Sequence, residues 1–113
     1  MANKVTVIGA GSVGSTIAFM MAVRGIAAKI VLIDINEKKA LGEAMDIRQG
    51  IPFCDPCKIY AGRYEHAKDS DIVVITSGIG RKPGQTRLEL AQTNVNIMKS
   101  IAAEVSVAAP NAV

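Results

Sequence analysis

The sequence contains no tryptophan, no long apolar run and no run of basic residues. These absences argue against two classes of protein, those that bind nucleic acids and those that span a membrane. Among 113 residues there are only two Tyr and two Phe, and 13 Lys and Arg are scattered among 10 acidic residues, for a net charge of +3. Nucleic-acid binding through basic runs with interleaved aromatics is therefore not indicated. The longest apolar run, residues 17–23, is seven residues long, whereas roughly 20 are needed to cross a bilayer. We expect neither a nucleic-acid nor a membrane partner.

Cysteine and histidine are also scarce, which argues against metal and redox chemistry. Cys54 and Cys57 form a C-x-x-C pair, a spacing found in half zinc sites and in redox pairs. A zinc site needs two more ligands, and His66 is the only histidine. A redox pair should lie at a helix N-terminus, whereas this pair precedes a predicted strand. We expect two free thiols, no metal site and, since no leader precedes the first predicted strand, a cytoplasmic location.

Aliphatic residues are abundant, and they alternate between strand-like and helix-like segments. Half of the chain is hydrophobic, mainly Ile, Val, Ala, Leu and Met, which suits parallel strands buried on both faces. Right-handed crossovers then give the strand order 3-2-1-4, so the predicted fold is a doubly wound parallel α/β sheet, incomplete because such sheets usually have six strands. We predict strands at 4–9, 29–34, 58–61 and 71–76, and helices at 12–24, 37–49 and 87–107.

The apolar positions of the three helices predict which faces are buried. The first helix is apolar nearly all round, so we expect it to be well buried, with Gly25 as its C-terminal cap. In the second, which we expect Gly50 to stop, Ala40, Leu41, Ala44, Met45 and Ile47 should face the sheet. In the third, the predicted buried stripe is Leu88, Ala91, Val95, Met98, Ala102 and Val105.

The last four residues, 110–113, are interpreted as the lead-in to a fifth strand. The 113 residues are therefore expected to be the first part of a longer protein, with a natural minimal domain as the alternative.

The most specific motif is Gly9-x-Gly11-x-x-Gly14, which directly follows the first strand. Gly9 permits a tight turn, Gly11 lets the backbone approach a pyrophosphate, and Gly14 lets the helix pack close to the strand. The N–H groups at the start of that helix then face the phosphates. Asp34 ends the second strand 20 residues beyond Gly14, where a carboxylate accepts hydrogen bonds from the adenine ribose. The combination predicts a dinucleotide site.

Asp34 also discriminates between the two nicotinamide dinucleotides. A 2′-phosphate would face it as a like charge, a repulsion of about 4 kcal/mol at 4 Å and an effective dielectric constant of 20. The neighbouring Ile35 and Asn36 offer no arginine to receive that phosphate. We therefore predict NAD as the cofactor; a role for Asp34 as a helix cap or loop acid is the alternative.

The loop after the fourth strand, residues 77–86, is a second candidate site. In such sheets, ligands bind outside the carboxyl ends of the strands where the strand order reverses, and this loop lies over that point. Arg81 and Arg87 are six residues apart, and guanidinium groups bind carboxylates through paired hydrogen bonds. We interpret the loop as a lid for an anionic substrate; a solvated basic loop is the alternative.

Five segments spread over almost the whole chain match one known family. They are Gly-Ala-Gly-Ser-Val-Gly at 9–14, Val-Leu-Ile-Asp at 31–34, Gly-Glu-Ala-Met-Asp at 42–46, Asp-Ile-Val-Val-Ile-Thr at 71–76 and Arg-Lys-Pro-Gly-Gln-Thr-Arg at 81–87, followed by Asn94. In these segments the chain resembles the NAD-dependent lactate and malate dehydrogenases. The resemblance implies that the intact enzyme transfers hydride between NAD(H) and a small 2-hydroxy or 2-oxo acid, and that the chain is its N-terminal NAD-binding Rossmann domain.

The resemblance also implies roles for individual positions. Arg87 would be catalytic, polarising the substrate carbonyl, and Arg81 would bind the second carboxylate of malate or oxaloacetate where lactate enzymes usually have Gln. Malate is therefore favoured, with lactate as the alternative. Asn94 would contact both substrate and cofactor. The implied cofactor positions are Gly9, Ala10, Gly11, Ser12, Val13, Gly14, Asp34, Lys38, Tyr64, Thr76, Gly78, Ile79, Asn94 and Ser100.

The sequence departs from the family pattern in two respects. Gln49 stands where the family often has His at a subunit interface, which bears on the expected homo-oligomer, a dimer or tetramer. The segments that carry the catalytic His and the remaining substrate ligands in the family would follow residue 113, and the surroundings of His66 do not match that histidine. The chain alone is therefore expected to be inactive. A non-catalytic NAD-sensing Rossmann module, which would not need the loop with Arg81 and Arg87, is the alternative of another class.

Overall fold

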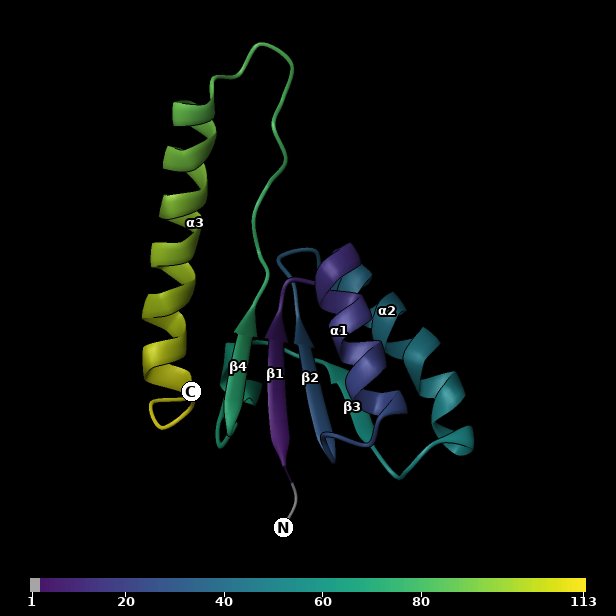
Figure 1. The fold of residues 1–113 in the computed structure, drawn as a ribbon. Coiled ribbons are helices and arrows are strands. Elements are labelled where there is room, and N and C mark those ends of the chain that lie inside the picture. Colours follow the sequence, from purple (N-terminus) through teal and green to yellow (C-terminus); the bar gives the residue numbers. More distant parts are fainter. Residues whose placement is uncertain (1–2) are drawn as a thin grey trace.

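A computed structural model of the protein describes residues 3–113 and shows a four-stranded parallel sheet flanked by helices (Figure 1). The strand order is β3-β2-β1-β4, which confirms the predicted doubly wound α/β arrangement. The elements are β1 (Lys4–Ile8), α1 (Ser12–Val23), β2 (Lys29–Ile33), α2 (Glu37–Gly50), η1 (Ile51–Phe53), β3 (Lys58–Ala61), η2 (Tyr64–Ala67), β4 (Ile72–Ile75) and α3 (Arg87–Ala108), where η marks a 3-10 helix.

The sheet is covered on both faces, which explains why its strands are apolar without alternation. On β1, Val5 and Val7 pack into one hydrophobic cluster while Ile8 packs into the other. On β2, Ile30 and Leu32 join the first cluster, which also contains residues of α1 and α2. The second cluster contains Val31, Ile33 and residues of η2 and α3. Figure 1 shows α1 and α2 together on one side of the sheet and α3 beyond the edge strand β4.

The expectation that α1 is well buried was wrong. Its buried residues include Gly14, Ala18 and Ala22, which recur every four residues and let one face of the helix approach the sheet closely. Val13 and Phe19 on the remaining surface are 63% and 49% exposed. Apolar residues all round a helix do not by themselves show how many of its faces have a packing partner.

The predicted buried stripe of α3 was right for Val105, which packs against the second hydrophobic cluster, and wrong for its other five residues. Leu88 is 83% exposed, and Val95 and Met98 are more than 40% exposed. The helix instead packs through Ile97 and Ile101, which belong to the second hydrophobic cluster. Two apolar stripes of similar strength run along this helix, and only the position of the sheet decides which one is buried.

In α2 the prediction was right for three positions and wrong for two. Ala40, Ala44 and Ile47 are buried, whereas Leu41 and Met45 are about half exposed, at 49% and 48%. Gly50 does not end the helical segment as predicted, since α2 includes it and the 3-10 helix η1 follows directly.

Backbone hydrogen bonds define two further ends, the end of α1 at Gly25 and the end of the chain at Val113. Gly25 has a φ of 63°, and the N–H groups of Gly25 and Ile26 donate to the carbonyls of Ala22 and Met21, which confirms Gly25 as the cap of α1. At the other end, the Val113 N–H donates to the Asp71 carbonyl and the Val73 N–H donates to the Val113 carbonyl, at 3.0 and 2.8 Å. This is the pairing of a parallel strand beside β4; the predicted fifth strand itself stays a prediction.

The closest packing between α1 and β1 occurs at Gly14, and it predicts a large loss of stability on substitution. A Cβ atom there would overlap the Gly9 carbonyl oxygen and lie 2.8 Å from Thr76 Oγ1. We expect Gly14→Ala to lower the free energy of unfolding by about 3 kcal/mol. Gly42→Ala is the matched control, because a Cβ at this exposed position of α2 meets nothing within 4 Å, and it should raise stability by about 0.5–1 kcal/mol. Urea unfolding followed by circular dichroism tests both; equal midpoints would contradict the packing argument.

Candidate functional site

The candidate site lies where the loops after β1 and β4 meet at the carboxyl ends of the strands. The chain leaves β1 toward β2 and returns from β3 to β4 on the other side of β1, so the strand order reverses between β1 and β4. Gly9 follows β1 with a φ of 111°. The Thr76 Oγ1 donates to the Gly9 carbonyl and the Ser77 Oγ to the Ile8 carbonyl, both at 3.1 Å. These two bonds fix the floor of the crevice.

A cavity of about 1110 Å³ opens above this floor, slightly larger than the roughly 300–1,000 Å³ typical of small-molecule sites. The predicted cofactor positions that line it are Gly9, Gly11, Asp34, Tyr64, Thr76, Gly78, Ile79 and Ser100. These residues come from the ends of β1, β2 and β4, from η2 and from α3. The fold therefore brings together positions that are up to 91 residues apart in the sequence.

Asp34 is held in place by two backbone hydrogen bonds. Its Oδ2 accepts from the Ala10 N–H at 2.7 Å and its Oδ1 from the Asn36 N–H at 2.9 Å. The first bond ties the end of β2 to the glycine loop, and the second orients the start of α2. A carboxylate has about four acceptor positions, so both oxygens retain lone pairs that can bind hydroxyl groups of a ligand.

The start of α1 differs from the starts of the other two long helices. Asn36 caps α2 and Thr86 caps α3 through their side chains, whereas Gly11 at the start of α1 makes no side-chain cap. The first N–H groups of a helix lack intrahelical acceptors and favour anions. A Cβ at Gly11 would meet nothing within 4 Å, so the fold itself does not require glycine there. The empty space beside Gly11 leaves room for a ligand group to approach the backbone.

Some predicted cofactor positions do not line the cavity. Lys38 is one of them, and the neighbouring Lys39 lines the cavity in its place. Ala10 is fully buried, and its N–H is already bound to Asp34. The others are Ser12, Val13 and Gly14, in the first turn of α1, and Asn94. The binding roles of all these positions stay predictions.

Asn94 joins α3 to the loop after β4. Its Oδ1 accepts from the Ile79 N–H at 2.9 Å, and its Nδ2 donates to the Ile79 carbonyl at 3.3 Å. Both groups of the amide therefore hold the backbone of a residue that lines the cavity. In this structure Asn94 positions the loop.

The two loop arginines are exposed and lie outside the cavity. The Arg81 Nε donates to the Gln85 carbonyl at 2.8 Å, and Arg87 is the first residue of α3. Figure 1 shows this segment rising far from the sheet before α3 begins. The structure does not bring Arg81 or Arg87 to this cavity, and their role as a lid stays a prediction.

Two groups of residues that line the cavity were not predicted from the sequence. The first follows the carboxyl ends of β2 and β3, a position that could have been inferred from the topology. The second is the inward stripe of α3, which was not found because the other stripe was chosen. The first group is Ile35, Asn36, Glu37, Lys39, Gly62 and Arg63, and the second is Thr93, Asn96, Ile97, Ile101 and Glu104.

Tyr64 lines the cavity, and its surroundings shift the proton affinity of its hydroxyl. Burial raises the pKa of its hydroxyl, and the nearby Glu104 carboxylate raises it further. The phenol therefore keeps its proton at neutral pH and can donate a hydrogen bond into the cavity. His66, two residues later, is exposed, and its Nδ1 accepts from the Arg63 N–H at 2.9 Å, a local bond at the start of η2.

The two cysteines are free and partly buried. Burial raises the pKa of the Cys57 thiol, and Cys54 raises it further, so this thiol is protonated and weakly nucleophilic at neutral pH. Within residues 3–113, no group of three or more His, Cys, Asp and Glu side chains is arranged to hold a metal ion. None of the helices in the same part of the chain combines the length and apolarity needed to cross a membrane.

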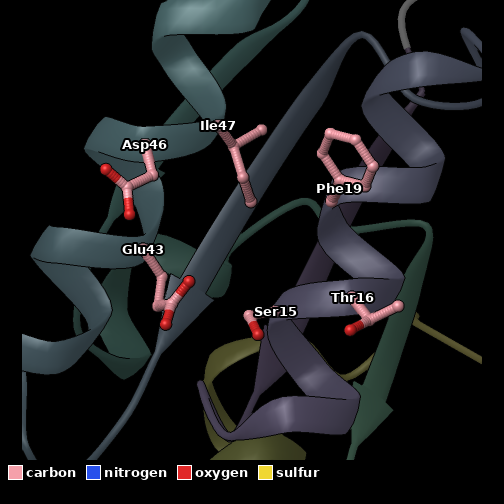
Figure 2. A pocket seen from close by; sticks show the side chains of 6 residues that line it. All are labelled: Ser15, Thr16, Phe19, Glu43, Asp46 and Ile47. Carbon is pink, nitrogen blue, oxygen red and sulfur yellow. The ribbon is translucent and has the colours of Figure 1, made fainter.

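A second, smaller cavity of about 320 Å³ lies between α1 and α2 (Figure 2). It is lined by Ser15, Thr16 and Phe19 of α1 and by Glu43, Asp46 and Ile47 of α2. The two hydroxyls already donate to the carbonyls of Gly11 and Ser12, and the two carboxylates repel anions. The cavity at the strand ends is therefore the better candidate for a phosphate-containing ligand.

Comparison with known proteins identifies close relatives. The sequence profile of a family described as lactate/malate dehydrogenase, NAD binding domain, matches residues 3–113. The L-lactate dehydrogenase of Thermoanaerobacter sp. (strain X514) is 51% identical over 102 residues, which are 90% of this chain and 33% of the relative. The L-lactate dehydrogenase of Clostridium perfringens (strain SM101 / Type A) is 50% identical over 111 residues, 98% of this chain and 35% of the relative.

Solved structures of both enzyme types share the fold. The minor L-lactate dehydrogenase from Enterococcus mundtii, in a ligand-bound form, superposes with a TM-score of 0.92 at 41% identity, over 95% of this chain and 34% of that one. Malate dehydrogenase from Archaeoglobus fulgidus in complex with NADH gives 0.89 at 41% identity, over 96% and 38%. The chain thus spans about a third of the length of the curated relatives it matches, at 33–35% in those compared above.

The paired hydrogen bonds of Asn94 predict that its loss loosens the loop after β4. In Asn94→Ala the Ile79 N–H loses its acceptor, so its amide should exchange with solvent about fivefold faster, corresponding to roughly 1 kcal/mol for one hydrogen bond. Gln92→Ala is the control, because Gln92 bonds to Asn96 within the helix. Hydrogen exchange of residues 78–85 provides the measurement, and equal exchange in the two variants would contradict the positioning role.

Proposed function

This chain belongs to the lactate/malate dehydrogenase family and matches its NAD-binding domain, and from this premise we propose that it is the NAD-binding part of an enzyme that transfers hydride between NAD(H) and a small 2-hydroxy or 2-oxo acid. The observation that supports this proposal best is the joint placement of the glycine loop, Asp34 and the open start of α1 around one cavity.

The residues of the cavity fit the parts of NAD in a definite order. Gly11 and the uncapped start of α1 would hold the pyrophosphate, since free N–H groups and close backbone approach are available there. Asp34 would accept from the hydroxyls of the adenine ribose. Gly78 and Ile79, at the other end of the cavity near β4, would flank the nicotinamide half. NAD, when bound, supplies the hydride donor or acceptor.

For the substrate we propose malate or oxaloacetate, on the basis of Arg81. The resemblance implies that an arginine at this position binds the second carboxylate of malate or oxaloacetate, whereas lactate enzymes usually have Gln there. In this structure Arg81 bonds to a single neutral acceptor, the Gln85 carbonyl. Exchange of that bond for a paired bond to a carboxylate is favourable, since hydrogen bonds to charged groups contribute about 1.5–3 kcal/mol. Arg87 would polarise the carbonyl that reacts, and Asn94 would keep the adjoining loop in place.

L-lactate is the second candidate substrate, because relatives about 50% identical to this chain carry the name L-lactate dehydrogenase. Arg81 in the loop thus favours malate or oxaloacetate, whereas the names of these relatives favour L-lactate. The predictions of a homo-oligomer and of a cytoplasmic location stay predictions.

Gly11 provides the sharpest test of cofactor binding, because the fold does not need it. A methyl group there contacts no protein atom within 4 Å but would occupy the space beside the backbone where the pyrophosphate is proposed to lie. We expect Gly11→Ala to leave the urea midpoint within error and to weaken NADH binding at least tenfold, a loss of about 1.4 kcal/mol. The fluorescence of NADH titrated with the 113-residue protein measures binding. Undiminished affinity in Gly11→Ala would sink the proposed placement.

Arg81 provides the test of substrate choice in the full-length protein. We expect kcat/KM for oxaloacetate to exceed that for pyruvate, and Arg81→Gln to lower the oxaloacetate value by about 10–150-fold, equivalent to a charged hydrogen bond of roughly 1.5–3 kcal/mol. Lys82→Gln removes a charge from the same loop and should leave the ratio unchanged. A wild type that prefers pyruvate would support lactate instead.

A further inference from the structure

An ion pair lies at the end of the cavity where the adenosine half of NAD is proposed to bind. The Arg63 Nε is 3.3 Å from the Glu37 Oε1, and both residues line the cavity with Asp34. Glu37 begins α2, three residues after Asp34, and Arg63 follows β3. Because β2 and β3 are neighbours in the sheet, the segments that follow them lie side by side.

This arrangement corrects one step of the sequence argument about the cofactor. In the sequence, the residues next to Asp34, Ile35 and Asn36, offer no arginine to receive a 2′-phosphate. Arg63 comes 29 residues after Asp34 in the sequence but lines the same cavity. A guanidinium group beside the ribose site usually binds the 2′-phosphate of NADP. The cavity therefore contains a cation that could bind such a phosphate.

Stability does not account for the Glu37–Arg63 pair. Its side chains are 67% and 70% exposed, and such exposed pairs contribute little to folding. Away from this pair, α2 is held to β3 by Arg48, whose Nη2 and Nε donate to the Ile59 carbonyl at 2.9 and 3.2 Å. Folding therefore does not depend on the pair, and its role can lie in ligand binding.

We propose that Glu37 is a second determinant of the choice between NAD and NADP, and that it acts by occupying Arg63. With the pair formed, an arriving 2′-phosphate meets the carboxylates of Asp34 and Glu37, while the one arginine of the cavity is already bound. Without Glu37, Arg63 provides a phosphate site. The inference rests on the proposed NAD-binding function of the same cavity.

The test compares the binding of NADH and NADPH in a series of variants of the 113-residue protein, using the fluorescence of the nucleotides. Asp34→Asn keeps the shape of the side chain and removes the first charge, which should lower the preference for NADH. Adding Glu37→Gln should lower it by about a further fivefold, the upper range for an exposed ion pair. Adding Arg63→Gln to this double variant should restore the preference of the single variant.

Glu65→Gln in the Asp34→Asn background is the matched control, because Glu65 is exposed, lies two residues from Arg63 and does not line the cavity. It should change the preference less than twofold. If Glu37→Gln shifts the preference no more than this control, or if its effect persists without Arg63, the inference is wrong while NADH binding by the wild type still supports the proposed function. A wild type that does not bind NADH would overturn the proposed function and this inference together.

Discussion

The close contact between the first turn of α1 and the end of β1 is the constraint on which the rest of the site depends. Gly14 has no room for a Cβ beside the Gly9 carbonyl, and Thr76 holds that same carbonyl from the β4 side. The contact sets the start of α1 at the carboxyl edge of the sheet, between the ends of β1 and β4. The N–H groups that the cavity offers to an anionic ligand follow from this placement, because the free N–H groups of a helix are useful only where a ligand can reach them.

A second set of bonds connects the glycine loop to the rest of the cavity. Asp34 bonds to the Ala10 N–H and so couples the end of β2 to the loop after β1, while Asn94 couples α3 to the loop after β4. Loops that lie on a surface are usually mobile, and these bonds restrict them at the residues that line the cavity. The more distant loop with Arg81 is held mainly by its own Gln85. The rigid part of the site thus coincides with the proposed cofactor region, and the exposed part with the proposed substrate region.

The two candidate substrates are supported by different parts of the sequence: L-lactate by identity over nearly the whole chain, and malate by one residue of a loop. The name L-lactate dehydrogenase comes from relatives that are about 50% identical to this chain over 102–111 residues. Arg81 is a single position in an exposed loop, where substitutions cost the fold little. Specificity in such a family changes through few residues, so overall identity is a weak guide to it.

The sequence by itself determined the features that depend on neighbours along the chain. The glycine spacing, the cap at Gly25 and the position of Asp34 at the end of β2 are local, and the structure has each of them. The strand order also followed, because right-handed crossovers leave few arrangements.

Only the tertiary structure decided which faces of the helices are buried and which distant residues meet. In α3 two apolar stripes compete, and the sheet selects the one with Ile97 and Ile101. Arg63 meets Glu37 because β2 and β3 are adjacent, a proximity that no local pattern encodes. The physical reason is the same in both cases: burial and long-range charge pairing depend on where other elements lie, and a local sequence window does not contain that information.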